Sequence, residues 1–109
     1  MRILGLAPLA ALLVACTISE DDFPAEYAET WCDRAQECDP DGFENLFGDD
    51  VEQCEEINGD AAEVWLDLAD LAGETYDEGL GYECVRDTKK ASCDELEDGD
   101  VDCDVWTDE

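Results

Sequence analysis

Six cysteines spread from Cys32 to Cys103 are the feature that most limits how this chain can fold. The residues around them are poor in core-forming side chains, because positions 17–109 contain only 16 Leu, Ile, Val or Phe but all 33 Asp and Glu of the chain. Such a sequence stays disordered unless something other than a large apolar core holds it. Three disulfides would do so, because each constrains the unfolded chain by about 2 to 4 kcal/mol.

The spacing of these cysteines favours a disulfide framework over other cysteine chemistry. The pattern C-x5-C-x15-C-x29-C-x8-C-x9-C contains no C-x2-C pair, which disfavours zinc knuckles and thioredoxin-like redox sites. Sequence alone does not choose among the fifteen pairings of six cysteines. We expect Cys38 to pair with Cys54, since the first would end one helix and the second would lie in the next. The cysteines expected in bridges are Cys32, Cys38, Cys54, Cys84, Cys93 and Cys103.

The chain begins with the pattern of a secretory signal. Arg2 supplies a positive charge, and an apolar stretch of 12 residues runs from Ile3 to Val14. As a helix this stretch would cover about 18 Å, too little for a hydrocarbon core of about 30 Å. A cleaved leader is therefore expected rather than a membrane span.

Leu13-Val14-Ala15-Cys16 closes this leader and resembles the lipobox of bacterial lipoproteins. The resemblance implies cleavage before Cys16, which then becomes the amino terminus and carries lipid. Lipidation would also account for the odd one of the seven cysteines, since six can pair completely. The alternative is an ordinary secretory signal cut nearby, with Cys16 lost or left as a thiol.

A second resemblance covers most of the remaining chain. Trp31-Cys32, Cys38-Asp39-Pro40 and Ser92-Cys93-Asp94-Glu95-Leu96, in this order, resemble small cysteine-rich lipoproteins that are abundant in myxobacteria and related lineages. This resemblance implies a helical disulfide domain and adds no catalytic chemistry.

Apolar residues at helical spacing run from Phe23 to Cys38, and Pro24 suits a first turn. Asp39-Pro40-Asp41-Gly42 would end this helix, and Asp50 would start another through Cys54. Asn58-Gly59 would interrupt the chain before the helix with the clearest periodicity, over 61–72. The expected core stripe of that helix is Ala61, Val64 or Trp65, Leu68, and Leu71 or Ala72.

A loop around Tyr76, a helix over 82–91 and a single turn capped by Ser92 would complete the fold. The sequence therefore predicts an all-α fold, a small disulfide-stapled domain of three to four short helices. The expected divisions are a signal peptide at 1–15, the lipidated Cys16 with an acidic tether at 16–22, a cysteine-rich helical domain at 23–96, and an acidic tail at 97–109 held by Cys103.

The net charge of −28 excludes nucleic acid as a partner, because phosphates would be repelled. A solvated acidic surface, as in proteins of saline habitats, is one explanation of this charge, and calcium binding is the alternative. The tail approximates the alternating oxygen ligands of a calcium loop, although Cys103 stands where an EF-hand loop has glycine. The expected metal ligands are Asp98, Asp100, Asp102, Asp104 and Glu109.

The chain lacks histidine, and its only serines are Ser19 and Ser92, in the tether and a cap. Nucleophilic catalysis would therefore lack its usual activating base, and no enzyme activity is expected. A carbohydrate-active or redox enzyme is the remote alternative. No cofactor is expected beyond loosely held divalent cations. The sequence thus predicts a secreted lipoprotein of the bacterial cell envelope, at the outer membrane or cell surface. It would reach the membrane through lipid on Cys16 and serve as a structural or interaction module for a protein partner that the sequence does not identify.

Overall fold

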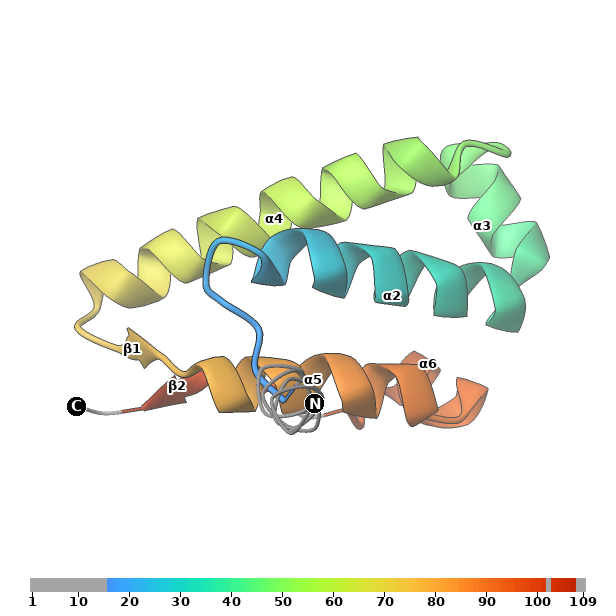
Figure 1. Cartoon of the computed structure of the whole chain (residues 1–109). Helices are drawn as coiled ribbons and strands as arrows, with labels where there is room; N and C mark the ends of the chain where they lie inside the picture. Colours follow the sequence, from blue (N-terminus) through green and yellow to red (C-terminus); the bar gives the residue numbers. More distant parts are fainter. Residues whose placement is uncertain (1–15, 102, 108–109) are drawn as a thin grey trace, which may run out of the picture.

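The computed structural model describes residues 16–101 and 103–107. This part of the chain forms five helices and one small antiparallel sheet of two strands (Figure 1). The elements are α2 (Phe23–Cys38), α3 (Pro40–Phe47), α4 (Val51–Leu71), β1 (Thr75–Tyr76), α5 (Glu78–Lys90), α6 (Cys93–Asp98) and β2 (Trp106–Thr107). The predicted all-α, disulfide-stapled class is confirmed, although the described residues form five helices where three to four short ones were expected.

Helix α2 is the centre of the arrangement, since it packs against α4 on one side and α5 on the other (Figure 1). Two small apolar clusters lie along it. The larger cluster contains the buried side chains of Ile18, Phe23, Leu66, Cys84 and Val105. The smaller one contains Cys32, Phe43 and Cys54. Disulfide sulfur thus takes part in both clusters, as expected for a chain with few large apolar residues.

Side-chain caps start most of the helices. The Asp50 carboxylate accepts a hydrogen bond from the Gln53 amide at 3.1 Å, as the sequence predicts for the start of α4. Ser92 and Glu95 form a complete capping box at the start of α6, also as predicted. Asp39 caps α3, so the segment expected only to end α2 also begins the next helix.

The expected interruption at Asn58-Gly59 is wrong, because α4 runs through both residues. The Asn58 side chain donates to the Cys54 carbonyl at 2.9 Å within the helix. Gly59 is buried against α2, and a Cβ at this position would lie 3.8 Å from the Pro24 carbonyl oxygen and 3.9 Å from the Ala28 Cβ. The glycine therefore serves close helix packing rather than a turn.

The expected core stripe of this helix is also wrong. Helix α4 buries Ala62, Leu66 and Ala69, whereas Val64 and Leu68 are exposed. The small Ala62 and Ala69 allow α2 to approach α4 closely, and the larger aliphatic side chains other than Leu66 lie outside the contact. Periodicity located the helix but not the face that it buries.

The segment expected as a loop around Tyr76 contains β1 and the first turn of α5. Strand β1 pairs with β2, which places Tyr76 opposite Trp106. Val105 is fully buried, and its carbonyl accepts a hydrogen bond from the Asp77 amide at 2.8 Å. The end of the described chain is thus held to the domain by backbone pairing and by an apolar contact.

Candidate functional site

Three disulfides pair all six cysteines between Cys32 and Cys103. They are Cys32–Cys54 between α2 and α4, Cys38–Cys93 between the end of α2 and the start of α6, and Cys84–Cys103 between α5 and the tail. The expected pairing of Cys38 with Cys54 is wrong. Cys32 and Cys38 are six residues apart and therefore about 240° apart around α2, so only Cys32 faces α4.

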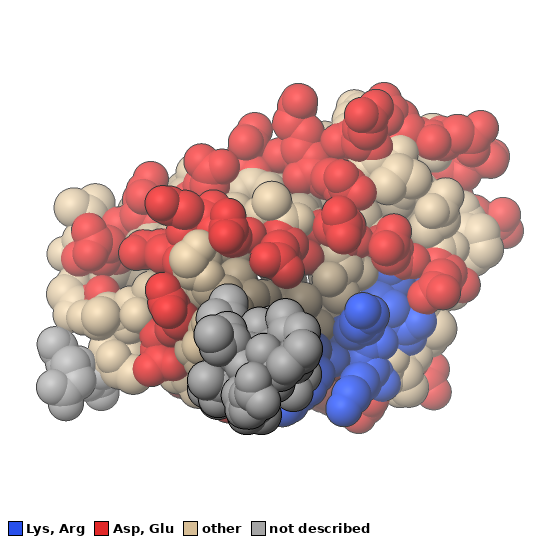
Figure 2. Space-filling model, in the orientation of Figure 1, with Lys and Arg blue, Asp and Glu red and all other residues tan. Residues whose placement is uncertain are grey.

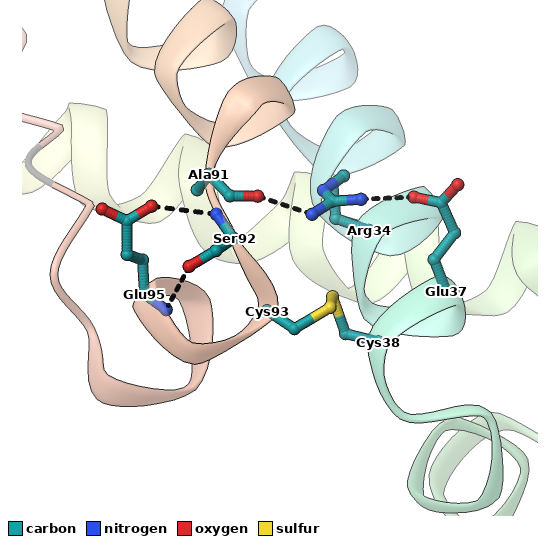
Figure 3. The surroundings of a disulfide bond; sticks show 7 residues. All are labelled: Arg34, Glu37, Cys38, Ala91, Ser92, Cys93 and Glu95. Carbon is teal, nitrogen blue, oxygen red and sulfur yellow. Dashed lines mark hydrogen bonds and ion pairs between the residues drawn. A yellow bond between two sulfur atoms is a disulfide. The ribbon is translucent and has the colours of Figure 1, made fainter.

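Polar contacts reinforce the Cys38–Cys93 bridge (Figure 3). Arg34 donates to the Ala91 carbonyl at 2.5 Å and to Glu37 at 2.6 Å. The Arg34 side chain is only 20% exposed, so its link to the end of α5 is partly shielded from water. This cluster fixes the end of α2 to the junction between α5 and α6.

The predicted lipidation residue, Cys16, is exposed at the beginning of the described chain. Leu13, Val14 and Ala15 of the lipobox, like the rest of the signal peptide at 1–15, lie outside the described residues. Two residues after Cys16, Ile18 is buried in the larger cluster. Its carbonyl accepts a hydrogen bond from the Tyr76 hydroxyl at 2.7 Å, and its amide donates to the Glu78 carbonyl at 3.1 Å. The expected acidic tether at 16–22 is therefore fastened to the domain close to Cys16.

Basic side chains gather near this docked segment. Arg86 and Lys89 line a hollow together with Thr17 and Ile18, and Lys89 lines a second hollow together with Arg34. Figure 2 shows the basic side chains as one patch, with acidic side chains spread over the remainder of the visible face, including α4. We call the group Arg34, Arg86, Lys89 and Lys90 the basic patch; these are all the basic residues in the described part of the chain.

The residues predicted to bind calcium do not converge in the described structure. Asp98, Asp100 and Asp104 are exposed, while Asp102 and Glu109 lie outside the described residues. Within residues 16–101 and 103–107, no group of three or more Cys, Asp or Glu side chains is arranged to hold a metal ion. Cys103 is fixed by its bridge to Cys84. Calcium binding by the tail stays a prediction.

Three side chains in the described residues have displaced pKa values that follow from packing, and burial alone raises the pKa of the first, Tyr27. Burial raises the pKa of the Tyr76 hydroxyl, and nearby carboxylates, Glu78 first among them, add to the effect. Desolvation is also the main cause that raises the pKa of Glu55 on α4, followed by repulsion from Glu29 and Asp33 on α2. Tyr76 is occupied by its hydrogen bond to Ile18, and Glu55 marks crowding of like charges between two helices. We therefore interpret the shifts of Tyr76 and Glu55 as structural.

One surface feature of the structure was not predicted from the sequence. The outer side of α4 carries an exposed row of apolar residues, which we call the α4 seam. It consists of Ile57, Ala61, Val64, Leu68 and Leu71. Helical periodicity predicts most of these residues to lie in the core. The signal that could have revealed the seam is a second apolar row in the same helix, formed by the buried Gly59, Ala62, Leu66 and Ala69. A helix with two apolar rows buries one and exposes the other unless it is covered on both sides.

An apolar hollow of about 320 Å³ lies where α2, α3 and α6 meet. Trp31, Phe43, Phe47 and Leu96 are among the side chains that line it. Its rim includes Leu46, which is largely exposed. The hollow lies at the far end of α2 from Ile18, so the segment that follows Cys16 does not reach it.

Comparisons of the chain with models of known protein families, with curated proteins and with solved structures found no match. None of the helices in the described residues combines the length and the apolar character needed to cross a bilayer.

Proposed function

We propose that this chain is a lipid-anchored protein of the bacterial cell envelope, held by lipid on Cys16, and that its acidic domain acts as a structural or interaction module. The observation that carries the proposal is the complete pairing of six cysteines in three disulfides. Disulfides form and persist in oxidising compartments outside the cytoplasm. Export is what the signal pattern at 1–15 predicts, and the lipobox resemblance assigns the anchor to Cys16.

The docking of Ile18 supports an anchor at Cys16 that holds the domain close to the bilayer. Because Ile18 is buried, only Cys16 and Thr17 separate a lipid on Cys16 from the packed domain. Two extended residues span at most about 7 Å. Such a short connection would limit which side of the domain can face the membrane.

The basic patch supports one orientation. Arg86 and Lys89 lie beside Thr17 and would therefore be near the lipid headgroups of a membrane that holds Cys16. A basic residue close to an anionic lipid surface contributes about 1 kcal/mol, whereas acidic side chains are repelled from such a surface. The basic patch would then face the bilayer, and α4, on the opposite side of α2 from α5, would face away from it (Figure 1).

Intact mass spectrometry of the full chain, produced in a lipoprotein-processing bacterium, tests the anchor. We expect a membrane-fraction species that begins at Cys16 and carries a thioether-linked diacylglycerol, with six cysteines oxidised. The matched control is Cys16→Ser, which should lose the adduct and leave the membrane fraction. A water-soluble parent protein without any fatty adduct would overturn the proposal, and several free thiols among the six bridge cysteines would contradict its disulfide framework.

A further inference from the structure

The α4 seam is the most extensive exposed apolar row in the described part of the chain. The exposed fractions are 49% for Ile57, 56% for Val64, 60% for Leu68 and 84% for Leu71, and the small Ala61 lies between them. In Figure 1, α2 packs on one side of α4, while no described helix or strand covers the outer side. A contiguous exposed row of large aliphatic side chains is typical of a binding surface.

The spacing of the seam specifies the shape of what it can bind. Successive residues of the seam are separated by four, three, four and three positions. This is the heptad spacing that keeps an apolar row facing a second helix in a coiled coil. Ile57 and Leu71 are 14 positions apart on α4, so the row is about 21 Å long, enough for roughly two heptads of a partner helix. The surface therefore fits a helix laid along α4.

Charge along the seam specifies the chemistry of that helix. Asp60 and Asp67 precede Ala61 and Leu68 and therefore flank the seam on one side, at the positions that contact the flanks of a partner helix. Glu63 and Asp70 extend the acidic edge outward, and both are exposed. On the other side Trp65 packs edge-on against Trp106 at 5.3 Å between ring centroids. Lys or Arg beside the apolar positions of a partner would complement the acidic edge.

A second copy of this chain fits the seam poorly. In an antiparallel pair Asp60 and Asp67 would face the same residues of the other copy, and in a parallel pair they would face Trp65 and Ala72, so neither arrangement forms a salt bridge. Each copy would also bring a formal charge of −28. Like charges at these flanking positions oppose association.

We propose that the α4 seam binds an amphipathic, basic helix of a partner protein, with the apolar face of that helix on Ile57, Val64 and Leu68 and its Lys or Arg residues on Asp60 and Asp67. This inference rests on the interaction role proposed above and gives that role a surface and a class of partner. It requires no lipid on Cys16, so the two proposals fail separately.

The test measures binding of synthetic 21-residue peptides by fluorescence anisotropy at physiological ionic strength. The protein is the full chain, purified with its disulfides intact. The probe peptide has Leu at its heptad core positions and Lys at its flanking positions. One control peptide has Ser at the core positions with the same Lys residues, and another has Glu at the flanks. We expect the probe to bind at least roughly tenfold more tightly than either control.

Variants of the protein separate the seam from general attraction to an acidic surface. Leu68→Ser should weaken probe binding roughly tenfold. Leu46→Ser is the matched control, because Leu46 is 74% exposed but lies on α3, off the seam, and it should leave binding unchanged. Asp60→Asn with Asp67→Asn should reduce the preference for Lys over Glu flanks. Far-UV circular dichroism and thiol counting should show the parent fold in every variant.

Equal probe binding by the parent and Leu68→Ser would overturn the inference, as would equal binding of the Leu-core and Ser-core peptides. Parent dimers that Leu68→Ser converts to monomers in sedimentation would assign the seam to a second copy instead. Faster release of lipidated Leu68→Ser than of the lipidated parent from phosphatidylcholine vesicles would assign it to a lipid surface. A parent protein without a fatty adduct would remove the anchor and leave the peptide result standing.

Discussion

Removal of the Cys38–Cys93 bridge by the double substitution Cys38→Ala and Cys93→Ala should cost more stability than any local contact around it. The two residues are 55 positions apart, the longest separation among the three disulfides. In the chain-entropy treatment, a loop of that length restricts the unfolded chain by about 4.2 kcal/mol at 25 °C. The corresponding value for Cys84–Cys103, with a separation of 19, is about 3.2 kcal/mol.

The structure makes this bridge the cleanest test of loop entropy. Cys38 and Cys93 are only partly buried, whereas Cys32 and Cys54 are fully buried in the smaller cluster. Loss of the buried pair would add a cavity cost to the entropic one. Helix α6 contains no buried residue, so the double variant should lose little packing there. The expected loss is therefore close to the loop value of about 4 kcal/mol.

Urea unfolding followed by far-UV circular dichroism, at one salt concentration for all proteins, measures this loss. A domain of this size should also melt roughly 20 °C lower. The matched control is Ser92→Ala, which removes the cap of α6 beside the bridge but keeps the bridge, and which should cost about 1 kcal/mol. If the double variant loses no more stability than Ser92→Ala, the bridge does not act through the unfolded chain and the reasoning is refuted.

Three further substitutions give expected outcomes of known sign, each measured by the same urea unfolding. Gly59→Ala should raise the free energy of unfolding by about 0.5 to 1 kcal/mol, because the helix gains a better helix former and the new Cβ makes only ordinary contacts. Gly81→Ala should lower it by about 1 to 3 kcal/mol, because the new Cβ collides with the Tyr76 hydroxyl and breaks its bond to Ile18; a gain in stability here would contradict the packing described. Glu55→Gln should stabilise slightly at pH 7, by a few tenths of a kcal/mol because solvent screens the group. The pKa of Glu55 is higher in the folded protein than in the unfolded chain, so the charged Glu55 carboxylate destabilises the fold at pH values above the folded pKa. This destabilisation disappears as the pH falls toward 4.5, the pKa of the unfolded chain. An advantage of Glu55→Gln that persists below pH 4 would refute this origin.

Local signals in the sequence predicted local features of the fold. Asp50 and Ser92 start their helices as predicted, because a cap depends only on residues within one turn. The need for disulfides followed from the shortage of large apolar residues. Cys103, the residue expected to hold the tail, does so through its bridge to Cys84, and Val105 and Trp106 add a buried side chain and a strand pair.

Features that depend on how two helices meet were not predictable in this way. The expected pairing of Cys38 with Cys54 rests on their places in consecutive helices, but the direction of Cys38 around α2 points it to α6. Asn58-Gly59 is a turn signal in most contexts, yet Gly59 lies where α2 approaches too closely for a large side chain. The exposed face of α4 had the larger aliphatic residues, so hydrophobicity favoured the wrong side. In each case the position of the neighbouring helix decides which contact forms, and the local sequence of the segment does not specify that position.

Disulfides supply part of the stability that burial of apolar side chains would otherwise have to supply, and this accounts for the exposed α4 seam. In a domain without bridges, Val64, Leu68 and Leu71 would be needed in the core, because 16 large aliphatic or phenyl side chains are few for 93 residues. Here three disulfides constrain the unfolded chain, and α4 packs on α2 through small residues. The larger side chains of α4 can therefore remain at the surface without loss of the fold. Because α4 and α5 lie on opposite sides of α2, a domain whose α5 side faced the membrane, as proposed, would present the seam and its acidic edge away from the membrane.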